Sequence, residues 1–164
     1  MDSDSSYRFA KIKLVITDVD GVLTDGGMYY TNKGDVMKRF FVRDGMGVTL
    51  LGKKNIPTLI ITKEETEMTR QWAKKMKIAK LYEGVIQKES ILDKICKNFK
   101  VKPDEIAYIG DDVNDVGLLK LVGLAVAPND AIDEVKKICH YKCKTNSGNG
   151  AFRELADLIL SKKS

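Results

Sequence analysis

The chain has 164 residues and, with 28 Lys and Arg against 23 Asp and Glu, a formal net charge of +5 at pH 7. Hydrophobic residues make up 43% and charged residues 31%, which excludes a disordered chain and is typical of one globular domain. No apolar run reaches the roughly 18–20 residues of a membrane-spanning helix. The polar start, Met1 to Phe9, lacks a secretion signal, so we expect residues 1–10 to be disordered and the protein to be cytoplasmic.

The cysteines and the basic charge each suggest a function that we set aside. Cys139, His140 and Cys143 resemble a zinc knuckle, but only Cys96 remains as a fourth ligand, so we favour free thiols near the surface. The excess of lysine suggests nucleic acid. Because the lysines are mixed with glutamates and lack an aromatic stacking pattern, we interpret them as solvated helix faces and expect no nucleic-acid partner.

Short β-branched runs alternate with amphipathic segments along the whole chain. In chain order we expect a strand Lys13–Thr17, a hairpin Met28–Thr31 and Val36–Phe41, a helix Asp44 to about Lys54, a strand Pro57–Thr62, a helix Lys63–Lys77, a strand Ala79–Glu83, a helix Lys88–Asn98, a strand Ile106–Gly110, a helix Val116–Leu121, a strand Leu124–Ala127, a helix Ile132–Ile138, a strand Tyr141–Lys144 and a helix Ala151–Ser161. This alternation predicts an α/β, Rossmann-like three-layer fold with a central parallel sheet and an inserted β-hairpin, in one domain over residues 1–164.

Acidic side chains follow two of the predicted strands. Asp18 and Asp20 come directly after the first strand, and Asp111 follows the strand that ends near Gly110. Because the carboxyl ends of parallel strands meet at one edge of the sheet, we expect these carboxylates to face one another, where they repel unless a cation lies between them. Hard oxygen ligands favour Mg²⁺, so the pattern predicts a magnesium site among the aspartates at this edge.

A magnesium site of this kind commonly also binds phosphate. Thr62 ends another strand and offers a hydroxyl and a backbone N–H, while Lys88 offers an ammonium at the start of a helix. Asp18 can attack phosphorus to form an aspartyl-phosphate, and Asp20 can protonate the leaving alcohol and later activate water. Gly21 permits the turn that brings Asp20 into the site. Each signal alone is weak, but the ordered set predicts phosphoryl transfer.

The ordered motifs resemble those of the haloacid dehalogenase superfamily. The first is the run Asp18-Val19-Asp20-Gly21-Val22-Leu23-Thr24-Asp25, the second is Thr62, the third is Lys88, and the fourth is Gly110-Asp111-Asp112-Val113-Asn114-Asp115. More narrowly, the chain after about Lys11 resembles the small phosphatases that act on 3-deoxy-D-manno-octulosonate (KDO) 8-phosphate. Three further stretches support that branch: Thr24-Asp25-Gly26-Gly27, Val42-Arg43-Asp44-Gly45-Met46-Gly47 and Gly148-Asn149-Gly150-Ala151-Phe152-Arg153-Glu154.

The resemblance implies a capless fold and a role for each matched residue. Asp18 is the nucleophile and a Mg²⁺ ligand, Asp20 is the general acid/base with its carbonyl on the metal, and Asp111 is the third protein ligand. Thr62 and Lys88 hold the phosphoryl group, and Asp112 and Asp115 support the metal shell and Lys88. It further implies a homotetramer with central hairpins, in which a neighbouring subunit closes the site. The apolar hairpin Met28–Phe41 fits an interface; the alternative is that it folds back onto its own core.

Two departures leave the sugar acid open. Where the octulosonate branch has Thr-Gly-Arg, this chain has Thr62-Lys63-Glu64, and its tail starts Asn146-Ser147-Gly148 in place of a Gly-Gly pair. If residues 63–77 are one helix, Lys75 lies three turns beyond Glu64 on the same face. That pair resembles the branch acting on nine-carbon keto acid 9-phosphates such as sialic acid or KDN precursors; alternatively, Glu64 is a first-turn residue favoured by the helix dipole. We take Glu64, Lys75 and Arg43 as candidate specificity residues.

Two other classes of protein share parts of this pattern. A signalling receiver domain also uses aspartates, a threonine and a lysine on a parallel sheet, but its acidic pair and phospho-acceptor lie on different strands. Here Asp18 and Asp20 share one strand end, which favours turnover. The second alternative is a catalytically silent regulatory module, against which the intact Asp18, Asp20, Lys88 and Asp111 argue.

Overall fold

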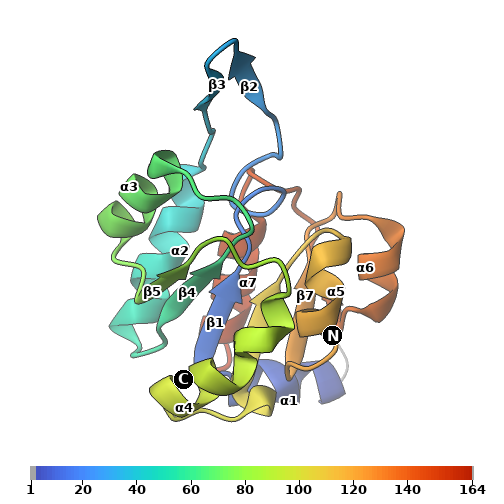
Figure 1. Ribbon diagram of the computed structural model, residues 1–164. Helices are drawn as coiled ribbons and strands as arrows, with labels where there is room; N and C mark the ends of the chain where they lie inside the picture. Colours follow the sequence, from blue (N-terminus) through green and yellow to red (C-terminus); the bar gives the residue numbers. More distant parts are fainter. Residues whose placement is uncertain (1–2, 164) are drawn as a thin grey trace.

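The computed structural model describes residues 3–163. Its main sheet consists of strands β1 (Leu14–Thr17), β4 (Thr58–Ile61), β5 (Lys80–Tyr82), β6 (Ile106–Ile109), β7 (Leu124–Ala127) and β8 (Tyr141–Lys142). They run parallel in the order β5-β4-β1-β6-β7-β8 (Figure 1). The α/β class, the parallel sheet and the position of each strand of this sheet are therefore confirmed, and β1, which ends just before Asp18, lies near the middle of the sheet.

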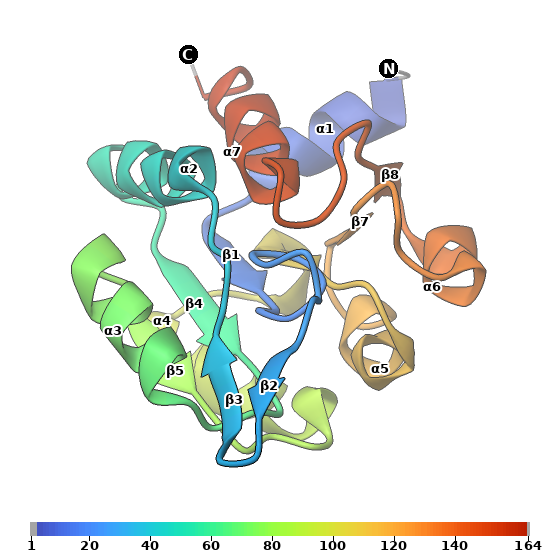
Figure 2. The same cartoon turned by 90° about the horizontal axis from the view of Figure 1, so that it is seen from above.

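Helices cover both faces of this sheet. They are α1 (Ser3–Lys11), α2 (Val42–Lys53), α3 (Glu67–Met76), α4 (Leu92–Phe99), α5 (Val116–Leu119), α6 (Asp133–Ile138) and α7 (Ala151–Leu160), with short 3-10 turns η1 (Lys88–Ile91), η2 (Pro103–Glu105) and η3 (Val113–Asp115). The core on one face includes side chains of α1, α2, α3 and α7, and the core on the other includes those of α4, α5 and α6. Figure 2 shows α2 and α7 side by side on the first face. No helix of the described chain is long and apolar enough to cross a membrane.

Strand β1 shows why apolar residues follow one another without alternation in the predicted runs. Leu14 and Ile16 belong to the core under α4 and α5, while Val15 belongs to the opposite core. All four residues of β1 are buried. A strand covered on both faces has no solvent side, so its sequence loses the alternation of a half-exposed strand.

The inserted hairpin projects from the edge of the molecule at which β1 ends (Figure 1). Its strands are β2 (Tyr29–Thr31) and β3 (Gly34–Met37), which pair antiparallel with an irregularity at Tyr29 and Tyr30. Met28 and Tyr30 are 71% and 64% exposed, so the hairpin does not fold back onto its own core. Only its base is anchored, where the Phe40 ring stacks on Trp72 with centroids 4.9 Å apart.

The expectation of disorder over residues 1–10 is wrong for residues 3–10, since α1 begins at Ser3; residues 1 and 2 lie outside the described chain. Phe9 is fully buried, and its ring packs edge-to-face with that of Tyr141, with ring centroids 5.5 Å apart. The Arg8 guanidinium donates a hydrogen bond to the Gly123 carbonyl at 3.0 Å. The segment is polar in composition, but one large apolar side chain docks it.

We expect Phe9→Ala to lower the free energy of unfolding by about 3–5 kcal/mol, because it empties a fully buried aromatic site. Tyr7→Ala is the matched control on the same helix; Tyr7 is 61% exposed, so its loss should change stability by less than about 0.5 kcal/mol. Urea unfolding measures both. Equal, small effects would mean that α1 does not pack on the domain.

Candidate active site

Asp18 stands at the carboxyl end of β1 with its carboxylate buried. Its Oδ1 accepts a hydrogen bond from the Val19 N–H at 2.7 Å and lies 2.9 Å from the Lys88 ammonium. Burial raises the pKa of Asp18 to about 7, against the opposing charge of Lys88. Because Oδ1 has two partners, Oδ2 is the oxygen left to meet a metal or a substrate.

Lys88, at the start of η1, is fully buried beneath Asp18. Its ammonium lies 2.6 Å from Asp115 Oδ1 and 3.2 Å from the Tyr108 hydroxyl, in addition to its contact with Asp18. Burial alone would lower the pKa of Lys88, but the charges of Asp18 and Asp115 outweigh it and raise that pKa, so the ammonium stays charged. These three contacts occupy all three of its N–H donors.

Asp115 is saturated with hydrogen bonds. Its Oδ1 accepts from Lys88 and from the Tyr108 hydroxyl, and its Oδ2 accepts from the backbone N–H groups of Asp111 at 2.8 Å and Asp112 at 3.2 Å. A carboxylate offers about four acceptor positions, and all of them are used. Asp115 therefore fixes Lys88 and the loop after β6, which fits the predicted supporting role.

Tyr108 is a part of this network that sequence reasoning missed. It lies on β6 and is fully buried, and burial together with the charges of Asp115 and Asp18 raises its pKa well above the ordinary value. The signal was available, because a tyrosine inside an apolar strand needs a partner for its hydroxyl.

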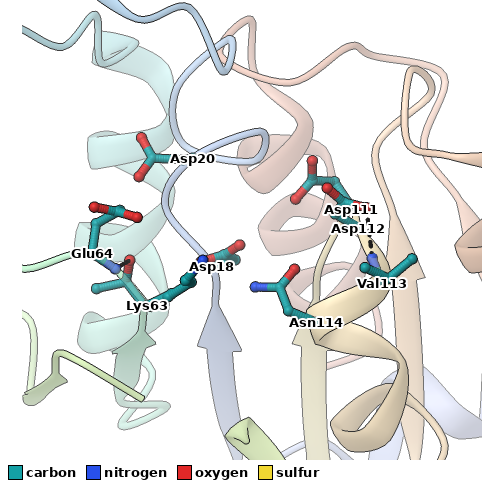
Figure 3. A pocket seen from close by; sticks show the side chains of 9 residues that line it. Asp18, Asp20, Lys63, Glu64, Asp111, Asp112, Val113 and Asn114 are labelled. Carbon is teal, nitrogen blue, oxygen red and sulfur yellow. Dashed lines mark hydrogen bonds between the residues drawn. The ribbon is translucent and has the colours of Figure 1, made fainter. Parts of the chain in front are cut away.

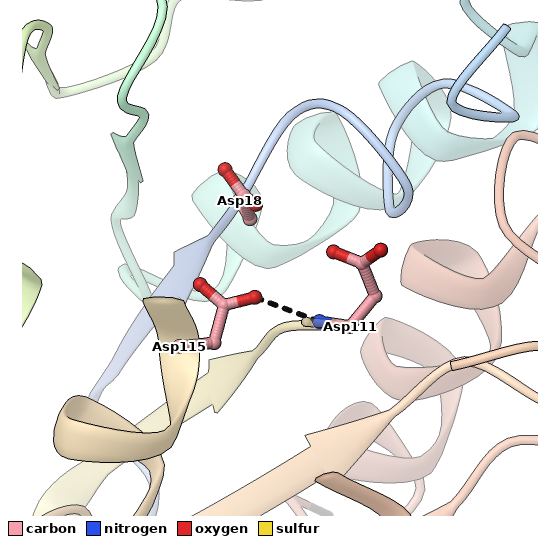
Figure 4. Close-up of side chains that lie close together, drawn as sticks. All are labelled: Asp18, Asp111 and Asp115. Carbon is pink, nitrogen blue, oxygen red and sulfur yellow. Dashed lines mark hydrogen bonds between the residues drawn. The ribbon is translucent and has the colours of Figure 1, made fainter. Parts of the chain in front are cut away.

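Asp111 turns its carboxylate toward Asp18. Asp18, Asp111 and Asp115 can each place one ligand atom so that all three lie within 4.8 Å of one another (Figure 4). Oδ1 of Asp111 is buried without a hydrogen-bond partner among the described residues. Burial, followed by the charge of Asp18, raises the pKa of Asp111 to about 8. Since Asp115 is saturated, the available pair is Asp18 and Asp111.

These two carboxylates fit a hard divalent cation. The two carboxylates face each other with raised pKa values, and Asp111 Oδ1 is buried without a hydrogen-bond partner among the described residues. This combination is typical of a metal site whose positive charge comes from the bound ion. Gly21 allows the loop to close over the pair: its φ is +88°, and a Cβ at this position would overlap the Asp111 carboxylate. Mg²⁺ would be held by the carboxylates of Asp18 and Asp111.

Asp20 and Thr62 border the same cavity, which has a volume of about 300 Å³ (Figure 3). The full lining is Asp18, Asp20, Thr62, Lys63, Glu64, Asp111, Asp112, Val113 and Asn114. The Asp20 carboxylate is turned to the side of Glu64, away from Asp111, and its Oδ1 lies 2.6 Å from the Lys38 ammonium, a contact that sequence reasoning also missed. Asp112 caps η3, with its Oδ1 accepting from the Val113 N–H.

Thr62 can offer less than expected. Its backbone N–H donates to the Tyr82 carbonyl at 2.9 Å, so that group is not free for phosphate. Its hydroxyl accepts from the Glu64 N–H at 3.3 Å and borders the cavity. A phosphate contact from Thr62 therefore falls to its hydroxyl alone.

The expected helix Lys63–Lys77 starts later than predicted, at Glu67, with Thr66 as its N-cap. Glu64 precedes the helix, so the inference that Glu64 and Lys75 share one helix face is wrong. Lys75 does not border the cavity, and Arg43 lines a separate hollow with Arg153 and Glu154. Of the three candidate specificity residues, the structure places only Glu64 at the site.

The cysteines are not brought together. Cys139 packs against the core under α4 to α6, whereas Cys143 belongs to the core on the opposite face of the sheet. All three cysteines are free thiols, and Cys143 is buried. Among the described side chains, the one group able to hold a metal is the aspartate set above.

We expect the apparent affinity for Mg²⁺ to fall at least about tenfold between pH 8 and pH 6. The pKa values of about 7 for Asp18 and about 8 for Asp111 mean that both carboxylates take up protons over this range, and a metal must displace those protons. Calorimetric titration with Mg²⁺ measures the affinity and the proton release. Asp111→Asn should abolish binding, whereas Asp133→Asn, whose side chain is 86% exposed, should not. Equal affinity at both pH values would exclude these carboxylates as ligands.

Comparison with known proteins places this site in a family. Residues 51–155 match the family of haloacid dehalogenase-like hydrolases. The KDO 8-phosphate phosphatase of Yersinia pestis is 38% identical over 157 residues, and the match covers 96% of this chain and 84% of that protein. The enzyme of the same name from Haemophilus influenzae is 36% identical, and the match covers 93% of this chain and 85% of that protein. A KDO 8-phosphate phosphatase from Moraxella catarrhalis, solved in complex with magnesium, phosphate and KDO, has a TM-score of 0.95 and 30% identity, covering 99% of this chain and 93% of that one. The chain therefore belongs to the haloacid dehalogenase-like hydrolases.

Proposed function

We propose that this protein is a Mg²⁺-dependent phosphatase that hydrolyses the phosphate monoester of a 2-keto-3-deoxy sugar acid, with KDO 8-phosphate as the first candidate. The observation that carries the proposal is the position of Asp18, whose buried carboxylate opens on a polar cavity and faces Asp111 on one side and the Lys88 ammonium on the other. The substrate class rests on the relatives at 34–38% identity, whose names give that activity.

The residues suggest a two-step reaction. In the first step a carboxylate oxygen of Asp18 forms a bond to phosphorus while the bond to the sugar oxygen breaks, and Asp20 gives its proton to that oxygen. In the second step a water oxygen bonds to phosphorus, its proton passes to Asp20, and the Asp18–phosphorus bond breaks. Lys88 offsets the charge at Asp18 throughout, and a bound Mg²⁺ neutralises charge on the phosphoryl oxygens. The proposed roles of Lys88 and Thr62 at the phosphate remain predictions.

Steady turnover separates this function from the receiver domain and the silent module, and the family membership favours a hydrolase over both. A receiver domain would be phosphorylated once on Asp18 and then stop, and a silent regulatory module would not react with the phosphate ester.

We expect Asp18→Asn to lower phosphate release at least about a thousandfold and Asp20→Asn about a hundredfold or more, since one removes the nucleophile and the other the proton donor. Phosphate release from KDO 8-phosphate with Mg²⁺ and with chelator is the measurement. Asp133→Asn serves as the control, and circular dichroism checks the fold. Asp18→Asn activity above a few per cent would exclude Asp18 as the nucleophile.

The choice between eight- and nine-carbon acids centres on Glu64, which borders the cavity. We expect Glu64→Arg to raise the ratio of two kcat/KM values, that for KDO 8-phosphate divided by that for a nine-carbon 9-phosphate, at least about tenfold. The reason is that the substitution replaces a hydrogen-bond acceptor with a bidentate donor. The neighbouring Glu65→Arg is the control, because the Glu65 side chain is 65% exposed and does not border the cavity. An unchanged ratio would exclude Glu64 as a specificity residue.

We also propose that the protein forms a homotetramer through its hairpin and acts in the cytoplasm. The apolar side chains of the hairpin support the assembly, because Met28, Tyr30, Val36 and Met37 are each at least half exposed in the single chain. A second subunit over the cavity would also exclude water from a site that is otherwise open at the edge of the sheet.

A further inference from the structure

The hairpin holds one buried charge at its base. Val36 and Met37 are 54% and 50% exposed, but the side chain of the next residue, Lys38, is only 7% exposed. Burying an ammonium costs several kcal/mol unless an anion and hydrogen bonds compensate it. A lysine buried at the foot of an otherwise exposed ribbon therefore has a specific partner.

That partner is Asp20. The Lys38 Nζ lies 2.6 Å from Asp20 Oδ1, and the second carboxylate near it, that of Asp35, is more distant at 3.7 Å. The Thr24 hydroxyl donates to the same Asp20 oxygen at 3.3 Å. Oδ2 of Asp20 is buried and has no hydrogen-bond partner among the described residues. The two oxygens of Asp20 are therefore not equivalent.

The chain directly after Lys38 is fixed to the domain. Phe40 stacks on Trp72 and forms an isolated β-bridge with Thr24, while the Arg39 guanidinium donates to the Gly148 carbonyl at 2.9 Å. Lys38 thus reaches Asp20 from an anchored stem, and a long flexible side chain is held by its surroundings in one place.

We propose that Lys38 is the positioning residue of Asp20: by occupying Oδ1 it leaves Oδ2 as the oxygen that exchanges the proton with the leaving alcohol and with water. This inference rests on the function proposed above. In the first step the proton on Oδ2 moves to the sugar oxygen as the phosphorus–oxygen bond breaks, and in the second step Oδ2 receives a proton from the attacking water. Lys38 keeps its own protons throughout and acts only through Asp20.

A positioning role and a merely structural ion pair differ in how they depend on the leaving group. A sugar alcohol needs a proton as it leaves, whereas p-nitrophenolate is stable enough to leave without one. Loss of a positioned proton donor therefore slows the first step with the sugar phosphate but leaves the rate of the first step with p-nitrophenyl phosphate nearly unchanged. Damage to the loop that carries Asp18 slows both.

The test compares Lys38→Met with the unsubstituted protein in two assays, both with Mg²⁺. The first assay measures the single-turnover rate with KDO 8-phosphate, and the second measures the rate of the pre-steady-state burst of p-nitrophenol from p-nitrophenyl phosphate. We expect the first rate to fall at least about tenfold and the burst rate to change by less than about threefold. In an Asp20→Asn background, Lys38→Met should change the single-turnover rate by less than about twofold, because its effect passes through Asp20. Lys33→Met, at the exposed tip of the same hairpin, is the control and should leave both rates unchanged.

Each outcome bears on one claim. If the unsubstituted protein releases phosphate from neither substrate, the proposed function fails. If it is active and Lys38→Met slows both substrates equally, slows neither, or slows the Asp20→Asn variant as much as the parent, the positioning role of Lys38 is overturned while the phosphatase function stands. Thermal unfolding of each variant confirms that the compared proteins are folded.

Discussion

The site is organised by repulsion between buried carboxylates. Asp18, Asp111 and Asp115 bring ligand atoms within 4.8 Å of one another, and the ammonium of Lys88 contacts two of the three residues. Asp115 is stabilised by its four hydrogen bonds, so the remaining excess of negative charge falls on Asp18 and Asp111. A divalent cation between those two would resolve the imbalance, and it would let an anionic phosphate ester approach an acidic edge of the sheet.

Most of the fold was predictable, because buried parallel strands have an unmistakable sequence. Runs such as Leu14–Thr17 and Ile106–Ile109 are buried at each position, and the carboxylates that follow them converge for reasons of topology alone. The start of α3 was misjudged because the polar residues after Thr62 have ordinary helix propensity, and only the Thr66 cap, whose hydroxyl accepts from the Thr69 N–H, shows where the helix begins.

The side-chain contacts of the site were harder to predict than its strands. The pairing of Lys38 with Asp20 joins residues 18 positions apart across a hairpin, and that of Lys88 with Tyr108 joins residues 20 apart. Neither has a periodic or local signal, because the geometry arises only once the sheet and the hairpin stem are in place. For α1, composition led to the wrong expectation because the fully buried apolar side chain of the helix is a single residue, Phe9, which an average over nine positions hides.

The geometry at Gly21 limits how the loop after β1 can be engineered for rigidity. Replacing loop glycines normally stabilises a fold by restricting the unfolded chain, provided that the native backbone tolerates a side chain. Gly21 does not tolerate a side chain for two reasons: its φ is +88°, and an added methyl group would collide with the Asp111 carboxylate. Gly26 has a φ of +74°, but the nearest atom to an added methyl is 3.7 Å away, so only backbone strain opposes a substitution there. Efforts to stiffen this loop thus have to spare the glycine beside the acidic pair and start at its far end.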